Sequence, residues 1–474
     1  MVRVLLLLAC ACCVATAGAV PLTFTVNSSD DVPDVDPGDG VCETATGNGV
    51  CTLRGAIQES NIHVGSDKIV LQPNVTYMLS RVGQDGSALA GDLDVNDSVT
   101  ITGAGPTTVI DGNGGVLAEG VFSFAHCVRN NTTKDGTCVE GLVAATLSGL
   151  TIQHGYSTGL GGGINNAAFL DLRNCVITAN TANGTNGWGG GIANFGNLTL
   201  VGSVVSGNSI GGGNSFGGGI INLGYMTIDS TTISNNAISG LPGLGGGVYS
   251  NGQGETVIVN STISGNSAVA GAGIYTKDIV FTSVNTTISG NASSGDGGGV
   301  YSKSGQAGFY NVTIAQNSAN SDEFKSGSTG GGLFNEAGGL VYIANSIIAA
   351  NVVLVPTGGK PIRDPDQCAG TLNSFGNNLL SDIDLGHCTM TGAYALTPVS
   401  LGPLQNNGGP TRTHALLAGS AAIDAGNTAG CVDGNSEPIT KDQRGVRRPF
   451  GSYCDAGALE ASDTIFFNRF EIGI

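Results

Sequence analysis

The sequence of 474 residues carries 36 Asp and Glu against 18 Lys and Arg, for a net charge of -18. So acidic a chain is a poor partner for nucleic acid or for anionic membranes. Only 11% of the residues are charged while 79 are glycine, and that glycine content excludes an α-helical repeat protein. The composition therefore favours stacked strands and tight turns with a largely uncharged surface.

The first 19 residues have the form of a secretory signal peptide. Arg3 precedes an apolar run from Val4 to Val14, and small residues follow up to Ala19. A membrane-spanning helix requires about 20 apolar residues, so this run is too short, and no longer one follows. We therefore expect an exported protein without a transmembrane segment.

Nine of the 12 cysteines remain after the signal peptide, and eight of them lie in close pairs. Local disulfides are the natural assignment for such pairs in an exported chain. The pairs are Cys42 with Cys51, Cys127 with Cys138, Cys368 with Cys388 and Cys431 with Cys454. Cys175 is left over, and we interpret it as a small buried side chain of a strand.

Residues 20–65 should form an amino-terminal cap that contains an acidic stretch. Asp34, Asp36 and Asp39 precede a glycine turn with a spacing loosely like that of a calcium-binding loop. Such a loop needs Glu at its twelfth position, where this chain has Ala45. We prefer a solvated linker here, with calcium binding as the alternative.

The first strand of the expected coil carries Asp92 and Asp94 on one face. We expect Asp111 to lie near them, one turn later. Three carboxylates so placed would bind Ca²⁺ and activate a uronate substrate, with His126 or Arg129 as base or charge partner. The alternative, which we prefer, is that these Asp residues only start the coil.

Repeats of about 28 residues fill most of residues 66–355, which are expected to form the coil. Each repeat opens with a Gly-rich triplet and one aliphatic residue, and a strand that ends in Asn follows. The aliphatic residues are Ile164, Ile192, Ile220, Val248, Ile274, Val300 and Leu333. The asparagines are Asn180, Asn208, Asn236, Asn266, Asn291, Asn317 and Asn351.

One such repeat cannot bury both faces of its short strands by itself. Stacking the repeats about 4.8 Å apart pairs their backbone N–H and C=O groups and puts like side chains above one another. The sequence therefore predicts an all-β fold, a right-handed parallel β-helix with disulfide-stapled caps at both ends. The recurring asparagines should form an amide ladder inside it.

Four successive repeats place an aromatic ring directly after the aliphatic residue. Alternation along a strand turns Tyr249, Tyr275, Tyr301 and Phe334 outward into one column. Stacked rings bind sugar faces or a partner surface, and they also stabilise a fold by up to about 1 kcal/mol per pair. Both interpretations stay open, and this column is the leading candidate for a ligand contact.

A second outward column, eight residues past each triplet, is the place to look for a catalytic pair. It is expected to hold Asp171 and Glu255, three turns apart. That separation is about 14 Å, whereas the paired carboxylates of glycosidases lie about 5 to 9.5 Å apart. The repeats therefore argue against catalysis.

Residues 356–460 should form a carboxyl-terminal cap that closes the open end of the coil, where an uncovered strand edge would invite pairing. Charged residues of both signs gather in this region. They are Arg412, His414, Asp424, Asp442, Arg444, Arg447, Asp455 and Glu460. We interpret them as ion pairs that stabilise the cap rather than as an active site.

Several stretches resemble known families. Cys42 followed by Cys51-Thr52-Leu53-Arg54-Gly55-Ala56 resembles the CSLREA domain at the mature start of bacterial surface proteins, with Thr52 and Gly55 in place of Ser and Glu. The repeats are similar to those of chlamydial polymorphic membrane proteins.

The carboxyl-terminal part resembles the choice-of-anchor Q domain. Residues 401–414, 420–426, 442–445 and 455–460 carry this resemblance, and residues 461–474 resemble a short sorting tail. The family implies a bacterial, exported, surface-associated protein and assigns no activity.

Two functions fit these observations. The preferred one is a non-catalytic solenoid at the cell surface or outer membrane that mediates adhesion by binding a polysaccharide or another envelope or host-surface component. The other is a secreted polysaccharide lyase or glycoside hydrolase working near Asp92, Asp94 and Asp111. No cofactor is expected, and Ca²⁺ is the alternative, either at Asp34, Asp36 and Asp39 or, for the second function, at its three carboxylates.

Overall fold

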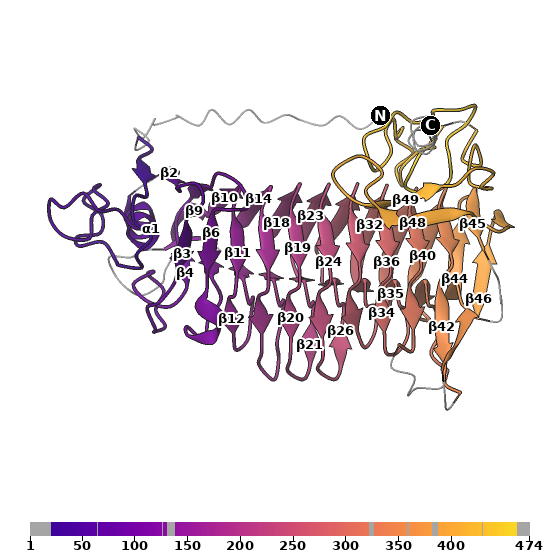
Figure 1. Cartoon of the computed structure of the whole chain (residues 1–474), viewed down its shortest axis with the longest axis horizontal. Helices are drawn as coiled ribbons and strands as arrows, with labels where there is room; N and C mark the ends of the chain where they lie inside the picture. The colour runs from indigo at the N-terminus through magenta and orange to yellow at the C-terminus, as the bar shows by residue number, and fades with distance from the viewer. Residues whose placement is uncertain are drawn as a thin grey trace, which may run out of the picture.

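The computed structural model describes residues 20–63, 65–125, 127–129, 138–321, 327–357, 360–381, 387–428 and 430–461. Within them the chain forms the predicted right-handed parallel β-helix, seen as a row of stacked strands in Figure 1. The predicted signal peptide and most of the predicted tail, residues 462–474, lie outside the described residues. No helix in the described part of the chain is long and apolar enough to cross a membrane.

Most turns of the coil contribute one strand to each of three faces. The first face consists of β1 (Thr23–Thr25), β2 (Asp67–Val70), β5 (Val99–Thr102), β10 (Ala144–Ser148), β14 (Phe169–Arg173), β18 (Asn197–Val201), β23 (Tyr225–Asp229), β28 (Glu255–Val259), β32 (Ile279–Val284), β36 (Gly305–Tyr310), β40 (Leu340–Ala344), β44 (Cys368–Ser374) and β46 (Cys388–Thr391). The second face consists of β3 (Thr76–Met78), β6 (Val109–Asp111), β11 (Thr151–Gln153), β15 (Val176–Thr178), β19 (Val204–Ser206), β24 (Thr232–Ser234), β29 (Thr262–Ser264), β33 (Thr287–Ser289), β37 (Thr313–Ala315), β41 (Ile347–Ala349), β45 (Asn378–Leu380) and β47 (Tyr394–Leu396).

The third face consists of β4 (Leu93–Val95), β7 (Phe122–Phe124), β13 (Ile164–Asn166), β17 (Ile192–Asn194), β22 (Ile220–Asn222), β27 (Val248–Asn251), β31 (Ile274–Lys277), β35 (Val300–Ser302) and β39 (Leu333–Asn335). A narrow sheet follows the second face in the chain and is made of β12 (Tyr156–Ser157), β16 (Thr181–Ala182), β20 (Ser209–Ile210), β25 (Ala237–Ile238), β30 (Ser267–Ala268), β34 (Ala292–Ser293), β38 (Ser318–Ala319), β42 (Val352–Val355) and β43 (Ile362–Pro365). Outside these sheets lie the pairs β8 (Cys127–Arg129) with β9 (Cys138–Leu142), β21 (Ser215–Phe216) with β26 (Gly243–Leu244) and β48 (Leu401–Gln405) with β49 (Thr413–Leu416), and the short helix η1 (Asn113–Gly115).

The recurring asparagines form the predicted amide ladder inside the coil. From Asn180 to Asn317, each Nδ2 donates to Oδ1 of the next asparagine at 2.9–3.0 Å. Asn351 ends the row by donating to Gln367 Oε1 at 3.0 Å. Each Nδ2 also donates to a backbone carbonyl, and each Oδ1 from Asn208 onward also accepts a backbone N–H. The buried amides are thereby satisfied, as burial requires.

The Gly-rich triplets are shaped by this ladder. A Cβ at Gly191, the last glycine of its triplet, would lie 3.0 Å from Cγ of Asn208 and 2.8 Å from the carbonyl oxygen of Gly219. Only glycine leaves room for the neighbouring asparagine side chain. The triplet and the asparagine are therefore two halves of one packing arrangement.

Helix α1 (Leu53–Ile62) covers the start of the coil, and the predicted Cys42–Cys51 disulfide lies beside it. Thr52 caps the helix by accepting the N–H of Gly55 at 3.0 Å. Arg54 is buried and binds Asp31 at 2.5 Å. The residues that carry the CSLREA resemblance therefore lie in this helix and in the disulfide beside it, at the start of the coil.

The acidic stretch forms a loop in which Asp36 and Asp39 are exposed, as predicted for a solvated stretch, whereas Asp34 is not. Asp34 is buried, and its carboxylate accepts the backbone N–H groups of Asp36 and Glu43. Burial raises the pKa of Asp34 although these bonds oppose the shift. Asp39 accepts the N–H of Val41. In the described residues, no group of three His, Cys, Asp or Glu side chains could hold a metal ion.

The coil continues past the expected boundary at residue 355. Strands β44 to β47 add further turns up to Leu396. Residues 401–461 then fold back along the outside of the second face, beside the later turns in Figure 1, and do not close the end of the coil as predicted. Ser289 of β33 bonds His414 at 2.8 Å, and Asn345 donates to the carbonyl of Asp455 at 3.0 Å.

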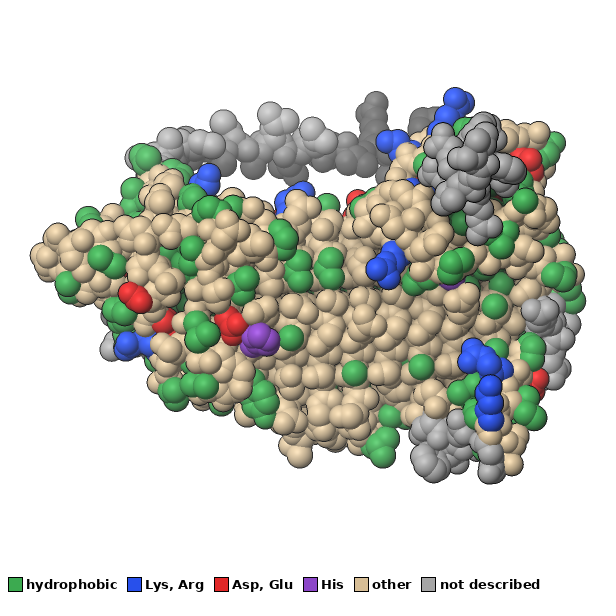
Figure 2. Space-filling view, viewed as in Figure 1, with side chains coloured by type: hydrophobic (Ala, Val, Ile, Leu, Met, Phe, Trp, Pro, Cys, Tyr) green, Lys and Arg blue, Asp and Glu red, His purple; other side chains and the backbone are tan. Residues whose placement is uncertain are grey.

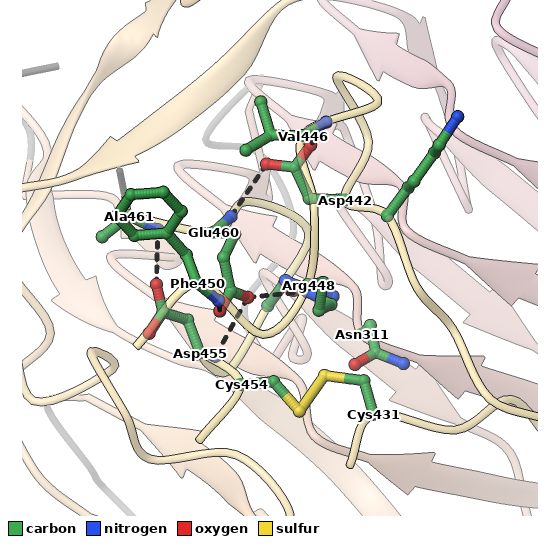
Figure 3. Close-up of polar contacts among 12 residues, drawn as sticks. Asn311, Cys431, Asp442, Val446, Arg448, Phe450, Cys454, Asp455, Glu460 and Ala461 are labelled. Carbon is green, nitrogen blue, oxygen red and sulfur yellow. Dashed lines mark hydrogen bonds and ion pairs between the residues drawn. A yellow bond between two sulfur atoms is a disulfide. The ribbon is translucent and has the colours of Figure 1, made fainter. Parts of the chain in front are cut away.

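A buried ion-pair network holds this region together (Figure 3). Arg448 Nε donates to Glu460 Oε2 at 2.8 Å, and its Nη1 donates to Asn285 of the coil at 3.0 Å. Arg444 binds Asp442 at 2.7 Å. The predicted structural role is confirmed for Asp442, Arg444 and Glu460, and the partner of Glu460 is Arg448, which the predicted set did not include.

The cysteines follow the prediction where they are described. Disulfides join Cys368 to Cys388 and Cys431 to Cys454. The side chains of Cys127 and Cys138 lie outside the description. Cys175 is a buried free thiol, and burial raises its pKa to about 11.

Replacing Asn266 by Ala should destabilise the coil by about 3 kcal/mol, because two buried donors of Asn236 lose their acceptor. Urea unfolding followed by the fluorescence of Trp188 measures this. Asn183→Ala, at an exposed amide, should cost less than about 0.5 kcal/mol. Equal losses in the two variants would contradict the role of the ladder.

Replacing Glu460 by Ala should loosen residues 401–461 by about 3 to 5 kcal/mol, because Arg448 is left buried and unpaired. Hydrogen exchange should show lost protection there, while the asparagine ladder keeps its protection. Loss of protection in both regions together would show that they unfold as one unit.

Candidate functional site

An open cleft of about 340 Å³ lies on the outside of the third face at its first turns. Its floor is a row of half-buried residues in register, with Asp94 on β4 beside Ser123 on β7 and Ser123 beside Asn165 on β13. Asp92 and Glu119 also line the cleft. The structure thus brings Asp92 and Asp94 of the predicted set to one site.

The predicted aromatic column is the continuation of this same row. After Asn165 the row passes through Ala193 and Ile221 to Tyr249, Tyr275, Tyr301 and Phe334. Successive rings from Tyr249 to Phe334 stack with centroids 4.7–5.3 Å apart. The row therefore changes from polar at its start to aromatic at its end.

The aromatic column is not an exposed contact surface along its length. Tyr249 and Tyr275 are only 5% and 4% exposed, because Trp188, Phe216 and Leu244 of the preceding loops pack over them. The prediction of ligand contact is wrong for these two rings. Tyr301 and Phe334 are half-buried, and the Tyr301 hydroxyl donates to Glu336 at 2.7 Å.

Asp92 has the most perturbed carboxyl group of the cleft. Burial, together with the charges of Asp94 and Glu119, raises the pKa of Asp92 to about 8, although Arg54 opposes the shift. Burial also raises the pKa of Glu119. Asp92 therefore keeps its proton at neutral pH.

The amino-terminal cap holds the walls of the cleft in place. Arg54 donates to the carbonyls of Ala88, Gly91 and Asp92 at 2.9–3.3 Å. Glu119 Oε2 accepts the N–H of Asp92 at 3.2 Å. A Cβ at Gly91 would lie 2.4 Å from the backbone carbonyl oxygen of Gly83, and φ is +68°, so glycine is required there.

The carboxylates of the cleft also organise its loops. Both oxygens of Asp85 accept backbone N–H groups, from Leu89 and from Ala90. Asp94 Oδ2 accepts the N–H of Ala88 at 3.4 Å. These bonds keep acceptor-rich side chains at fixed positions along the cleft.

Asp111 does not join this site. It lies on β6 of the second face, where it accepts hydrogen bonds from Gln153 at 2.8 Å and from the N–H of Asn113 at 2.8 Å and contacts His154 at 2.9 Å. Burial acts to raise the pKa of Asp111, but these contacts outweigh it and lower the pKa. The side chains of the predicted partners His126 and Arg129 lie outside the description.

Sequence reasoning missed Glu119. Leu93, Phe122 and Ile164 pair in register, so Asp92 takes the place of the last glycine of a triplet and Glu119 that of the first. The site could have been identified from Asp or Glu in the first turns at positions where the later repeats have glycine.

The cleft is acidic and, among its described lining residues, contains no Lys, Arg or His. Figure 2 shows a coil whose broad middle is largely uncharged. The cleft can therefore accept hydrogen bonds from hydroxyl groups, and its charge disfavours an anionic ligand.

No family model matches the chain, and no curated protein is similar to it in sequence. Among solved structures it is similar to the crystal structure of pectate lyase Pel9A, with a TM-score of 0.47 and 15% identity over 94% of this chain and 98% of that chain. At this identity the likeness concerns the fold alone.

The wild type should become less stable as the pH rises, because Asp92 ionises in the folded chain. Asp92→Asn should not show this loss. The folded chain holds this proton up to about pH 8, whereas an ordinary Asp loses it near 3.8, so ionisation opposes folding between these values. Urea midpoints at pH 5, 7 and 9 should diverge in favour of the variant with rising pH. Asp278→Asn, at an exposed carboxyl, controls for net charge. Parallel curves for wild type and Asp92→Asn would contradict the assignment.

Proposed function

We propose that this chain is an exported β-helix held at the bacterial surface, which binds a neutral polysaccharide in the acidic cleft without cleaving it. The observation that carries the proposal is the lining of the cleft, where Asp94, Ser123 and Asn165 lie in one row and none of the described lining residues is Lys, Arg or His. Sugar hydroxyls donate to such carboxylate and amide oxygens.

The export and surface attachment rest on the signal-like first 19 residues and on the two resemblances at the ends of the chain. A long polymer suits the location of the site, because the cleft opens on the outside of a rigid rod. The uronate substrate considered from the sequence fits less well, because the carboxylates would repel it.

Glycoside hydrolysis is the second candidate, and Asp92 is the observation that favours it. A carboxyl group that keeps its proton at neutral pH, beside the charges of Asp94 and Glu119, has the form of a general acid with a nearby base. Against this role, Asp94 and Glu119 already accept backbone N–H groups of the cleft.

A variant with a filled cleft tests whether the cleft binds polysaccharide, and a product assay tests whether the chain cleaves it. Ser123→Trp should abolish binding to immobilised neutral polysaccharides, because the indole would occupy the floor of the cleft. Thr199→Trp, also half-buried and outward but on the first face, is the matched control and should bind as the wild type does. A reducing-end assay on the same polymers should detect no product.

If the wild type released product and Asp92→Asn did not, the function would be hydrolysis and not binding alone. Equal binding by Ser123→Trp and the wild type would show that the cleft is not the site.

A further inference from the structure

A second pocket lies where the carboxyl-terminal region meets the outside of the coil. This junction pocket has a volume of about 250 Å³. The coil contributes Tyr310, Asn345, Phe375 and Asn377, and the carboxyl-terminal region contributes Asp433 and Ser436. Ligand sites occur preferentially at such interfaces between structural units.

One wall of the junction pocket is an exposed aromatic ring. Phe375 is 65% exposed, although it is a large apolar residue next to the end of β44. One side of its ring stacks on Tyr342, with centroids 5.2 Å apart and planes inclined by 16°. The stack fixes the ring and leaves its other side available as a flat apolar platform.

Asn345 attaches the wall of the junction pocket to the carboxyl-terminal region. The residue is 4% exposed, and its Nδ2 donates to Asn311 at 2.5 Å and to the carbonyl of Asp455 at 3.0 Å. Its Oδ1 is buried without a hydrogen-bond partner among the described residues. This oxygen has almost no accessible surface and lies beside Gly426, so Asn345 joins the carboxyl-terminal region to the coil behind the pocket and is not a contact that a ligand reaches.

The polar character of the junction pocket calls for a ligand that donates hydrogen bonds. Asp433 accepts the backbone N–H groups of Asn435 and Glu437, which holds its carboxylate in place at the pocket. The described lining contains no Lys, Arg or His, so an anionic ligand finds no counter-charge. A flat apolar side with hydroxyl donors around it is the chemistry of a sugar ring.

We propose that the junction pocket binds a neutral sugar, with one face of the pyranose ring on Phe375 and its hydroxyl groups directed to Asp433. This site is separate from the acidic cleft, which is formed by the first turns at the other end of the coil. It would give the rod a second contact along one polymer or a contact to a different glycan. The proposal does not depend on the function assigned to the cleft.

The test is titration of the purified chain with the methyl glycosides of glucose, galactose, mannose and N-acetylglucosamine, followed by saturation-transfer NMR. At least one should bind the wild type, with a Kd of about 1 mM. Phe375→Ala should weaken binding at least about tenfold, because the stacking platform is lost. Asp433→Asn keeps an oxygen for the loop hydrogen bonds and should weaken binding severalfold.

Phe450→Ala is the matched control, because Phe450 is an exposed ring of the same region that does not line the pocket. It should bind like the wild type. Failure of all four glycosides to bind, or unchanged binding by Phe375→Ala, would overturn the proposal. Binding lost in Ser123→Trp but kept in Phe375→Ala would assign the sugar to the cleft instead, and would support the proposed function while overturning this inference.

Discussion

The structure depends on the buried ladder of amides that runs from Asn180 to Asn351. Each amide binds the next turn through its side chain and through its backbone, so successive turns can stack only in one register. The ladder also demands glycine beside it, which explains why the Gly-rich triplets and the asparagines share one period. Once this register is set, every outward row of side chains is set as well.

One outward row links the architecture to the proposed function. It begins with Asp94, Ser123 and Asn165, which face solvent, and it ends with stacked aromatic rings that are mostly covered. Trp188, Phe216 and Leu244 pack over the row as far as Tyr275 and bury it there. The first turns lack this cover, so the polar start of the row forms the floor of a cleft.

The period of the sequence was enough to predict the coil, the ladder and the aromatic column, because each repeats a residue type in one register. Departures from the period were not predictable. Thr227 pairs with Val257 and not with Glu255. The chain takes nine residues from Val248 to Val257 but only seven from Ile220 to Thr227, although both stretches start from paired residues. The burial of Tyr249 depends on β21 and β26, which carry no repeated motif. Glu119 escaped notice because it replaces a glycine.

The acidic cleft should select neutral polysaccharides over anionic ones. Affinity electrophoresis of the mature chain through gels that contain either a neutral polysaccharide or polygalacturonate, at equal ionic strength, tests this claim most directly. We predict that at least one neutral polymer retards the protein and that polygalacturonate does not. Stronger retardation by polygalacturonate, or its cleavage during the run, would contradict the account.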